Sequence, residues 1–226
     1  MASAQKLVPD AVVFDFDGLI LDTEWTTYQA TSEVFAEFDA EFSLDVWISF
    51  VGTTDHPHWT DLLAEQVSEP LDLEGLRTRR NARSFQLAQD LDLLPGVLAL
   101  MEALKAARVP IAVASASRME WPHRNLSARG LDHYFHTILC GDDVEFSKPH
   151  PAIYELACER LGVDPAGSVA LEDSVLGVES AKSAGMTAIA IPGHLTTDHD
   201  FGRADIIVGS CADLTVRDLA FMAARS

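Results

Sequence analysis

Short apolar runs rich in β-branched residues recur along the chain and alternate with segments whose apolar positions follow a helical period. Six runs have the length and composition of buried strands, at 11–15, 110–115, 137–140, 168–172, 187–191 and 205–208. Five helical patterns follow them, at 96–107, 118–129, 151–161, 176–184 and 213–224. This alternation is typical of βαβ units. The sequence therefore predicts an α/β fold with a doubly wound parallel sheet, a Rossmann-like core.

The interval between the first two predicted strands breaks this alternation. It contains no strand-like run, and its helical patterns lie at 26–38, 44–50, 58–67 and 74–90. The sequence Leu94-Pro95-Gly96 follows, and proline and glycine commonly end helices. We therefore expect residues 19–94 to form a helical cap domain, inserted into a catalytic core made of residues 1–18 and 95–226.

Composition narrows the range of partners. The 226 residues include 35 acidic and 16 basic ones, a formal net charge of −19, which argues against nucleic acid and anionic membranes. The three cysteines are widely spaced and form no CxxC pair, so we expect reduced thiols. No apolar run is long enough for a signal-peptide core or a membrane span. We expect a cytoplasmic monomer that acts on a small molecule.

The first predicted strand ends in the most informative segment of the chain, Asp15-Phe16-Asp17-Gly18. Side chains alternate along a strand with a period of two, so the Asp15 and Asp17 carboxylates can leave the strand on the same side. Ligands of parallel α/β proteins bind at this end of the strands. Two neighbouring carboxylates repel each other, so a metal ion, a lysine or a shared proton must compensate them.

Three further segments offer suitable groups near strand ends. Ser115 closes the second strand beside the small Ala116, where a hydroxyl can donate to an oxyanion. Lys148 lies in a loop that two prolines stiffen, and its ammonium group suits phosphate or carboxylates. Glu172 and Asp173 close the fourth strand, and such oxygen ligands suit Mg²⁺. Two pairs of acids at separate strand ends, with a lysine loop between them, are a specific combination.

In order and spacing, these motifs resemble those of haloacid dehalogenase superfamily phosphohydrolases, in the subgroup with a helical cap after the first strand. The resemblance implies that Asp15 is the nucleophile and forms an aspartyl-phosphate. It implies that Asp17 is the general acid and then the general base. Lys148 would bridge the phosphate and Asp15, while Ser115 and Ala116 would bind the phosphoryl group.

The same resemblance implies a metal site and a specificity loop. Mg²⁺ would be held by Asp15, Asp173 and the backbone carbonyl of Asp17. Glu172 would be either a further ligand or a residue that supports the ligands. Gly52 and Thr53 lie in the most loop-like part of the predicted cap, and the resemblance implies that this loop contacts the substrate.

Other branches of the superfamily fit less well. A halide needs no proton to leave, so Asp17 argues against a dehalogenase. Phosphonatases use a cap lysine, and residues 19–94 contain none. Mutases of the β-phosphoglucomutase type are closer, but residues 23–28 lack their histidine and residues 52–56 lack their arginine.

We therefore expect a Mg²⁺-dependent phosphatase of a small phosphorylated metabolite, such as a sugar phosphate. A phosphomutase is the alternative. A non-catalytic binding or regulatory module on the same fold is an alternative of another class.

Overall fold

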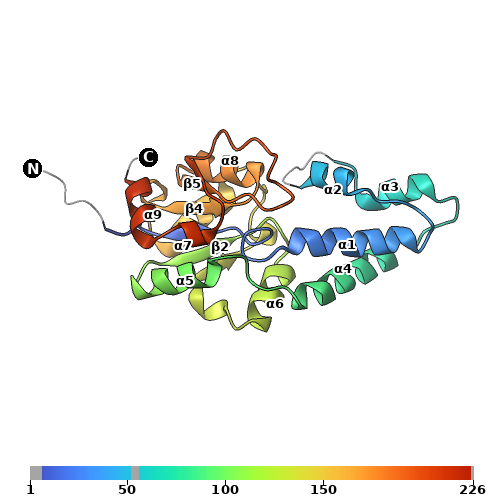
Figure 1. Ribbon diagram of the computed structural model, residues 1–226, viewed down its shortest axis with the longest axis horizontal. Helices are drawn as coiled ribbons and strands as arrows, with labels where there is room; N and C mark the ends of the chain where they lie inside the picture. The colour runs from blue at the N-terminus through green and yellow to red at the C-terminus, as the bar shows by residue number, and fades with distance from the viewer. Residues whose placement is uncertain (1–6, 52–55, 225–226) are drawn as a thin grey trace, which may run out of the picture.

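The computed structural model describes residues 7–51 and 56–224, which contain a six-stranded, fully parallel sheet (Figure 1). The strands are β1 (Val12–Phe14), β2 (Ile111–Ala114), β3 (Thr137–Leu139), β4 (Val169–Glu172), β5 (Thr187–Ala190) and β6 (Ile206–Ile207). All six predicted strands are confirmed. Their ends agree with the predicted ones or differ by one residue, because apolar character extends beyond the hydrogen-bonded ladder.

The strand order, β3-β2-β1-β4-β5-β6, places the first strand in the middle of the sheet. The chain runs outward from β1 to β2 and β3, then returns to the other side of β1 to form β4, β5 and β6. Val13 pairs with Ala112 of β2 on one side and with Ala170 of β4 on the other. The strand order therefore reverses between β1 and β4, and ligands of doubly wound sheets bind in the crevice at such a point.

Helices cover both faces of the sheet. One face packs against α5 (Val97–Ala106), α6 (Glu120–Ala128) and α9 (Val216–Ala223), and the other against α7 (Ala152–Leu161) and α8 (Val175–Ser183). Short 3₁₀ turns lie at Asp132–Tyr134, Gly141–Asp143, Pro165–Gly167 and Cys211–Asp213. Small strand residues on the α7/α8 face let these helices pack closely: Ala112, Ala114, Ala170, Ala188 and Ala190.

Between β1 and α5 the described residues form four helices, and Figure 1 shows them extending away from the sheet. They are α1 (Thr23–Ala36), α2 (Leu44–Phe50), α3 (Trp59–Gln66) and α4 (Leu73–Gln89), here named the four-helix segment. All four predicted helices are confirmed. Helix α1 begins three residues earlier than predicted, where the Thr26 hydroxyl donates to the Thr23 carbonyl.

The four-helix segment has a hydrophobic cluster of its own. Helix α1 packs along α4 (Figure 1), and the cluster contains Val34, Phe35, Phe42, Trp59, Leu63 and Leu76. The division into domains after residues 18 and 94 remains a prediction.

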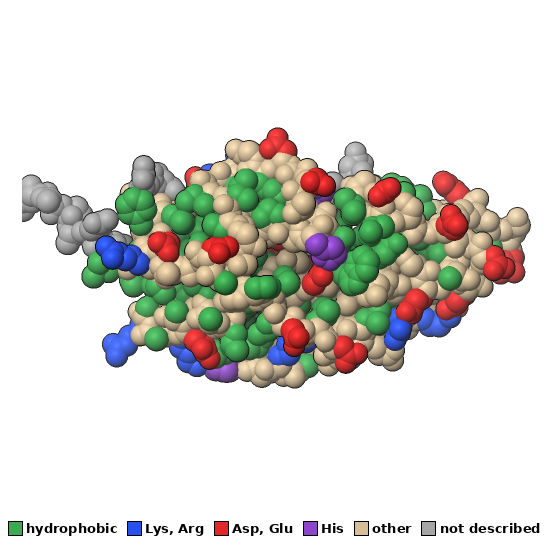
Figure 2. Space-filling model, in the orientation of Figure 1, with side chains coloured by type: hydrophobic (Ala, Val, Ile, Leu, Met, Phe, Trp, Pro, Cys, Tyr) green, Lys and Arg blue, Asp and Glu red, His purple; other side chains and the backbone are tan. Residues whose placement is uncertain are grey.

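The surface agrees with the acidic composition. Figure 2 shows Asp and Glu side chains dispersed across one face among hydrophobic and neutral groups. Within the two described stretches, no helix is both long and apolar enough to cross a membrane.

Candidate active site

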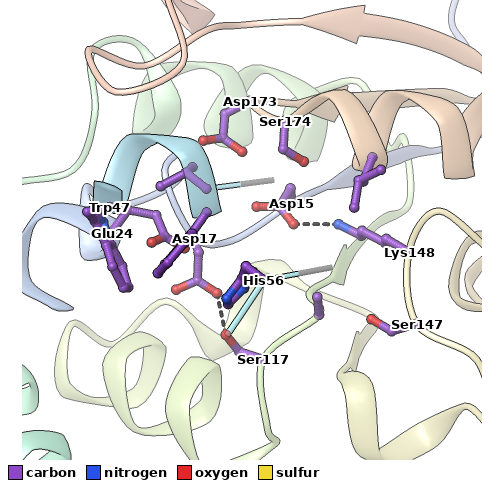
Figure 3. Close-up of a pocket in the computed structure, with 14 residues that line it drawn as sticks. Asp15, Asp17, Glu24, Trp47, His56, Ser117, Ser147, Lys148, Asp173 and Ser174 are labelled. Carbon is purple, nitrogen blue, oxygen red and sulfur yellow. Dashed lines mark hydrogen bonds and ion pairs between the residues drawn. The ribbon is translucent and has the colours of Figure 1, made fainter. Parts of the chain in front are cut away.

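The backbone of the central strands sets the floor of the site. Asp15 directly follows β1, and its N–H donates to the Leu171 carbonyl of β4 at 2.9 Å. Asp173 directly follows β4. Both carboxylates therefore lie where the strand order reverses. Lys148 reaches the same place from the loop before α7 (Figure 3).

Lys148 is a buried cation that joins two of the acids. Its Nζ donates to Asp15 Oδ1 at 2.5 Å, to Glu172 Oε1 at 2.6 Å and to the Ala114 carbonyl at 2.8 Å, so all three ammonium protons have acceptors. Burial alone lowers the pKa of Lys148. Asp15 and Glu172 together outweigh that effect and hold the pKa above its ordinary value, so Lys148 is a fixed positive charge.

Glu172 is fully buried, and its carboxylate already has three donors. Oε1 accepts from Lys148 and from the Tyr154 hydroxyl, and Oε2 accepts from Ser174 Oγ at 3.2 Å. Gly177 makes room for this group, since a Cβ there would lie 1.9 Å from Oε2. Burial raises the pKa of Tyr154 well above its usual value, and Glu172 adds to the shift, so the hydroxyl remains a donor.

Asp173 differs from the other acids because it has no hydrogen-bond or ion-pair partner among the described residues. It is 5% exposed. Burial raises its pKa well above the usual range, and Asp15 and then Glu172 add to the shift. The pKa of Asp15 is also raised, first by burial, although Lys148 opposes the shift. When all three are ionised, Asp15, Glu172 and Asp173 carry more negative charge than Lys148 alone compensates.

The acids fit a hard divalent cation. One oxygen from each of Asp15, Glu172 and Asp173 lies within 4.8 Å of the others. A buried carboxylate without a donor is costly unless it is protonated or paired with a cation. Carboxylate and carbonyl oxygens are the ligands that Mg²⁺ and similar ions prefer. Asp173 is therefore the group that most needs a cation.

Gly18 permits the close approach of Asp173 to the end of β1. Its φ is +79°, and a Cβ at this position would lie 2.0 Å from Asp173 Oδ2. Any other residue would combine backbone strain with a clash against this carboxylate. Gly18 thus sets the width of the crevice between β1 and Asp173.

Asp17 is held by hydrogen bonds rather than by a cation. Oδ1 accepts from Thr23 Oγ1 at 2.6 Å and from Trp121 Nε1 at 2.7 Å. Oδ2 accepts from Ser117 Oγ at 2.6 Å and from Ser115 Oγ at 3.2 Å. Donors from three separate segments thus converge on one carboxylate, and Figure 3 shows the contact with Ser117.

The two residues predicted to bind the phosphoryl group lie in different surroundings. Ala116 lines the cavity above Asp15, whereas Ser115 is fully buried and its hydroxyl donates to Asp17. Gly52 and Thr53, the other predicted substrate contacts, lie outside the described residues. The functional roles assigned to all these positions remain predictions.

Sequence reasoning missed Thr23, Ser117, Trp121 and Tyr154. Trp121 and Tyr154 lie in helices with ordinary amphipathic patterns, and nothing in those patterns distinguishes an inward-facing donor from a core aromatic. Thr23 and Ser117 had a weak signal, since each hydroxyl lies close to a motif residue in the chain.

A cavity of about 270 Å³ opens above the acids and continues to the four-helix segment (Figure 3). Its walls comprise Asp15, Asp17, Glu24, Trp47, Phe50, Val51, His56, Ala116, Ser117, Ser147, Lys148, Asp173, Ser174 and Leu176. Burial raises the pKa of Glu24 to about 8; Asp17 adds to this shift and Arg80 opposes it. The floor is thus strongly charged, while the opposite wall is largely aromatic.

This arrangement suits transfer of an anionic group to a carboxylate. Asp15 carries a nucleophilic oxygen beside a fixed cation, and Asp17 holds a second carboxylate nearby for proton transfer. The remaining buried acids can hold a cation that compensates an incoming phosphate.

Two curated proteins are similar to this chain over most of its length. YhcW of Bacillus subtilis (strain 168) is 38% identical over 204 residues, covering 90% of this chain and 93% of that protein. The Thermotoga maritima protein named "Phosphorylated carbohydrates phosphatase" is 31% identical over 204 residues, with the same two coverages of 90% and 93%.

The fold matches solved structures over nearly its whole length. CbbY from Rhodobacter sphaeroides in complex with phosphate superposes with a TM-score of 0.80 at 30% identity, covering 93% of this chain and 100% of that one. A second CbbY structure, in complex with xylulose-1,5-bisphosphate, gives a TM-score of 0.79 at 30% identity, with coverages of 91% and 96%. The sequence profile of the haloacid dehalogenase-like hydrolases matches residues 12–191. Since this match spans most of the chain, the protein belongs to the haloacid dehalogenase-like hydrolase family.

Proposed function

We propose that this protein is a Mg²⁺-dependent phosphatase that hydrolyses small phosphorylated carbohydrates through an aspartyl-phosphate on Asp15. One observation carries the proposal: the Asp15 carboxylate lies beside Lys148 on the floor of a cavity, and Asp173, which has no side-chain partner among the described residues, lies at the neighbouring strand end. The family membership and the phosphatase activity named for the Thermotoga relative support it.

In the first step an Asp15 oxygen attacks the phosphorus atom, and the bond between phosphorus and the ester oxygen breaks. Asp17 gives its proton to the departing oxygen, which leaves as an alcohol. In the second step a water molecule attacks the phosphorus, Asp17 takes a proton from it, and the bond to Asp15 breaks. Inorganic phosphate is released, and both carboxylates return to their starting state.

Proton transfer by Asp17 cannot supply the whole acceleration. General acid–base catalysis typically contributes about 10²–10⁴-fold, which is roughly 3–5 kcal/mol of barrier. Phosphate monoester hydrolysis requires accelerations of up to about 10²¹-fold. Positioning and compensation of the phosphoryl charge must supply the rest of the acceleration. Among the described residues, Lys148 is the cation that contacts the nucleophile, Asp15.

Asp15, Asp173 and the backbone carbonyl of Asp17 would hold Mg²⁺, and the ion would neutralise charge on the phosphoryl oxygens. Glu172 then has a supporting role, because its oxygens are engaged by Lys148, Tyr154 and Ser174. It fixes Lys148 at the distance from Asp15 that the reaction needs.

A carbohydrate is the substrate class that the cavity walls favour. Glu24 and His56 can hydrogen-bond hydroxyl groups, while Trp47 and Phe50 offer flat surfaces for a sugar ring. The phosphate would lie at the charged floor, and the sugar would lie against the four-helix segment.

The experiment measures inorganic phosphate released from a panel of hexose phosphates and 4-nitrophenyl phosphate, with and without Mg²⁺. We expect turnover that needs Mg²⁺ and falls by about 10⁴-fold or more in Asp15→Asn. Asp61→Asn, an exposed acid on α3, is the matched control and keeps the wild-type rate. Wild-type turnover in Asp15→Asn would overturn the assignment of the nucleophile.

The two alternatives give different products. A phosphomutase would convert a hexose 1-phosphate into its isomer and release little phosphate, and its second phosphate would come from a bisphosphate activator. A binding or regulatory module would turn over nothing on the panel while still folding and binding Mg²⁺. The helix α1 segment from Thr23 to Tyr28 offers no histidine for mutase chemistry, so we favour hydrolysis.

A further inference from the structure

Trp121 touches Asp17, although it lies 104 residues away in the chain and carries no chemistry of its own. Its indole N–H donates to Oδ1 at 2.7 Å. The other three donors to Asp17 are hydroxyl groups, which can rotate and accept a hydrogen bond instead. An indole N–H can only donate, so Trp121 requires Oδ1 to remain an acceptor.

This asymmetry decides which oxygen of Asp17 carries a proton. With Oδ1 facing the Trp121 N–H, a proton on the carboxyl group belongs on Oδ2. There the hydroxyls of Ser115 and Ser117 can turn and accept. Ser117 lines the cavity above Asp15, so Oδ2 is the oxygen on the side of the substrate.

The indole is in turn held by the four-helix segment. Phe85 of α4 meets Trp121 edge-to-face, with ring centroids 6.3 Å apart and an interplanar angle of 72°. The Arg124 guanidinium lies over the Phe85 ring, 3.6 Å from the ring centroid. Phe85 therefore packs against two side chains of α6, where α4 and α6 adjoin (Figure 1).

We infer that Trp121 is a positioning residue that orients Asp17 for proton transfer, and that Phe85 links its position to the four-helix segment. This inference rests on the proposed function, because it gives Asp17 the role of proton donor. Asp17 then works at full efficiency only while α4 packs against α6. Asp17 remains the group that gives and takes the proton. Trp121 only fixes the orientation of the Asp17 carboxyl group.

Trp121→Phe tests the inference because it keeps an aromatic ring against Phe85 and removes only the N–H. Single-turnover release of the alcohol isolates the step in which Asp17 acts as an acid. We expect the rate with a hexose phosphate to fall about tenfold or more, with KM changed by less than about twofold.

The leaving group separates positioning from general damage. 4-Nitrophenolate leaves without a proton, so the same variant should release it within about threefold of the wild-type rate. Phe85→Leu keeps the N–H but loosens the ring contact, and it should show the same selectivity with a smaller loss. Trp59→Phe is the control, since its buried Nε1 has no acceptor among the described residues.

Equal losses with both substrates, or no loss with either, would overturn the inference. If thermal melting showed that Trp121→Phe is unstable, Phe85→Leu alone would test the inference, by the same comparison of its losses with the two substrates. The failure of the proposed function looks different: Asp15→Asn would then keep alcohol release, whatever the effect of Trp121→Phe.

Discussion

The floor and the far wall of the cavity are built in different ways. Asp15 and Asp173 extend directly from paired strands, and a backbone hydrogen bond of 2.9 Å ties Asp15 to β4. Their separation is therefore set by the spacing of the sheet. Glu24 and Trp47 instead project from helices that are held by one small cluster of side chains. The floor is suited to chemistry that tolerates little displacement, and the wall to recognition that can adjust.

Polar satisfaction shows the same contrast. Within the described parts of the chain, the side-chain atoms that are buried without a hydrogen-bond partner are Ser32 Oγ, Trp47 Nε1, Trp59 Nε1 and Arg80 Nε. All four belong to the four-helix segment. In contrast, Lys148, Glu172 and Asp17 are each held by three or four hydrogen bonds. Asp173 is the exception at the floor: it has no donor among the described residues, but it is placed to bind a cation.

Removal of the floor's cation should have the largest effect. Lys148→Met leaves Asp15 and Glu172 buried together without compensation, so we expect activity to fall about 10³-fold. Unfolding free energy should fall by about 3–5 kcal/mol. Phosphate release and urea denaturation measure the two effects. Lys182→Met removes a surface ion pair with Asp205 and should cost at most about 1 kcal/mol. Similar stability losses in both variants would contradict the proposed contrast.

The width of the crevice is the next point to test. Gly18→Ala adds a Cβ 2.0 Å from Asp173 Oδ2, so Asp173 must move, and we expect activity to fall about 10²-fold. Gly162→Ala is a matched control, because Gly162 also has a positive φ, +68°, but open space around it. It should lose about 1–2 kcal/mol of stability and no activity. Full activity in Gly18→Ala would show that the floor tolerates displacement.

A cavity in the four-helix segment should affect stability more than chemistry. Leu63 is fully buried there, and Leu63→Ala should lower the unfolding free energy by about 2–5 kcal/mol. The folded variant should hydrolyse 4-nitrophenyl phosphate within about threefold of the wild-type rate, because the floor is untouched. Leu171→Ala, in β4, should instead lose both stability and activity. A larger activity loss in Leu63→Ala than in Leu171→Ala would contradict the contrast between the floor and the four-helix segment.

Glu24 should give the smallest effect, and one that depends on pH. Its folded-state pKa is raised from 4.5 to about 8, mainly by burial. Between these values the folded protein keeps a proton that the unfolded chain releases, so stability falls as pH rises through this window. The full difference between these two values corresponds to roughly 5 kcal/mol. Glu24 is only partly buried, so solvent screens its charge; the stability advantage of Glu24→Gln over wild type should be near zero below the lower value and reach about 1–2 kcal/mol at the upper one.

Urea denaturation at several pH values, in the absence of divalent metal, measures this difference. A Glu24→Gln advantage that stays constant across the pH range would show that the Glu24 carboxyl titrates normally.

The sequence by itself determined the framework and the charged floor. Six strand-like runs in alternation with helices predict a parallel sheet, and the acids at 15, 17 and 173 lie next to strand ends in the chain. Local geometry was sufficient here, because strands of one parallel sheet end along the same edge. The loop that carries Lys148 could be found in the same way, because the sequence shows both its two prolines and the small number of lysines in the chain.

Only the tertiary structure decided which groups serve those acids. Tyr154 contacts Glu172 and Trp121 contacts Asp17 because α7 and α6 are rotated by their packing on opposite sheet faces. Ser115, directly after β2, donates to Asp17 instead of lining the cavity. A helix can rotate through a small angle and present another side chain with the same amphipathic pattern. The partners of a carboxylate therefore depend on packing between segments that are far apart in the chain, which local sequence does not encode.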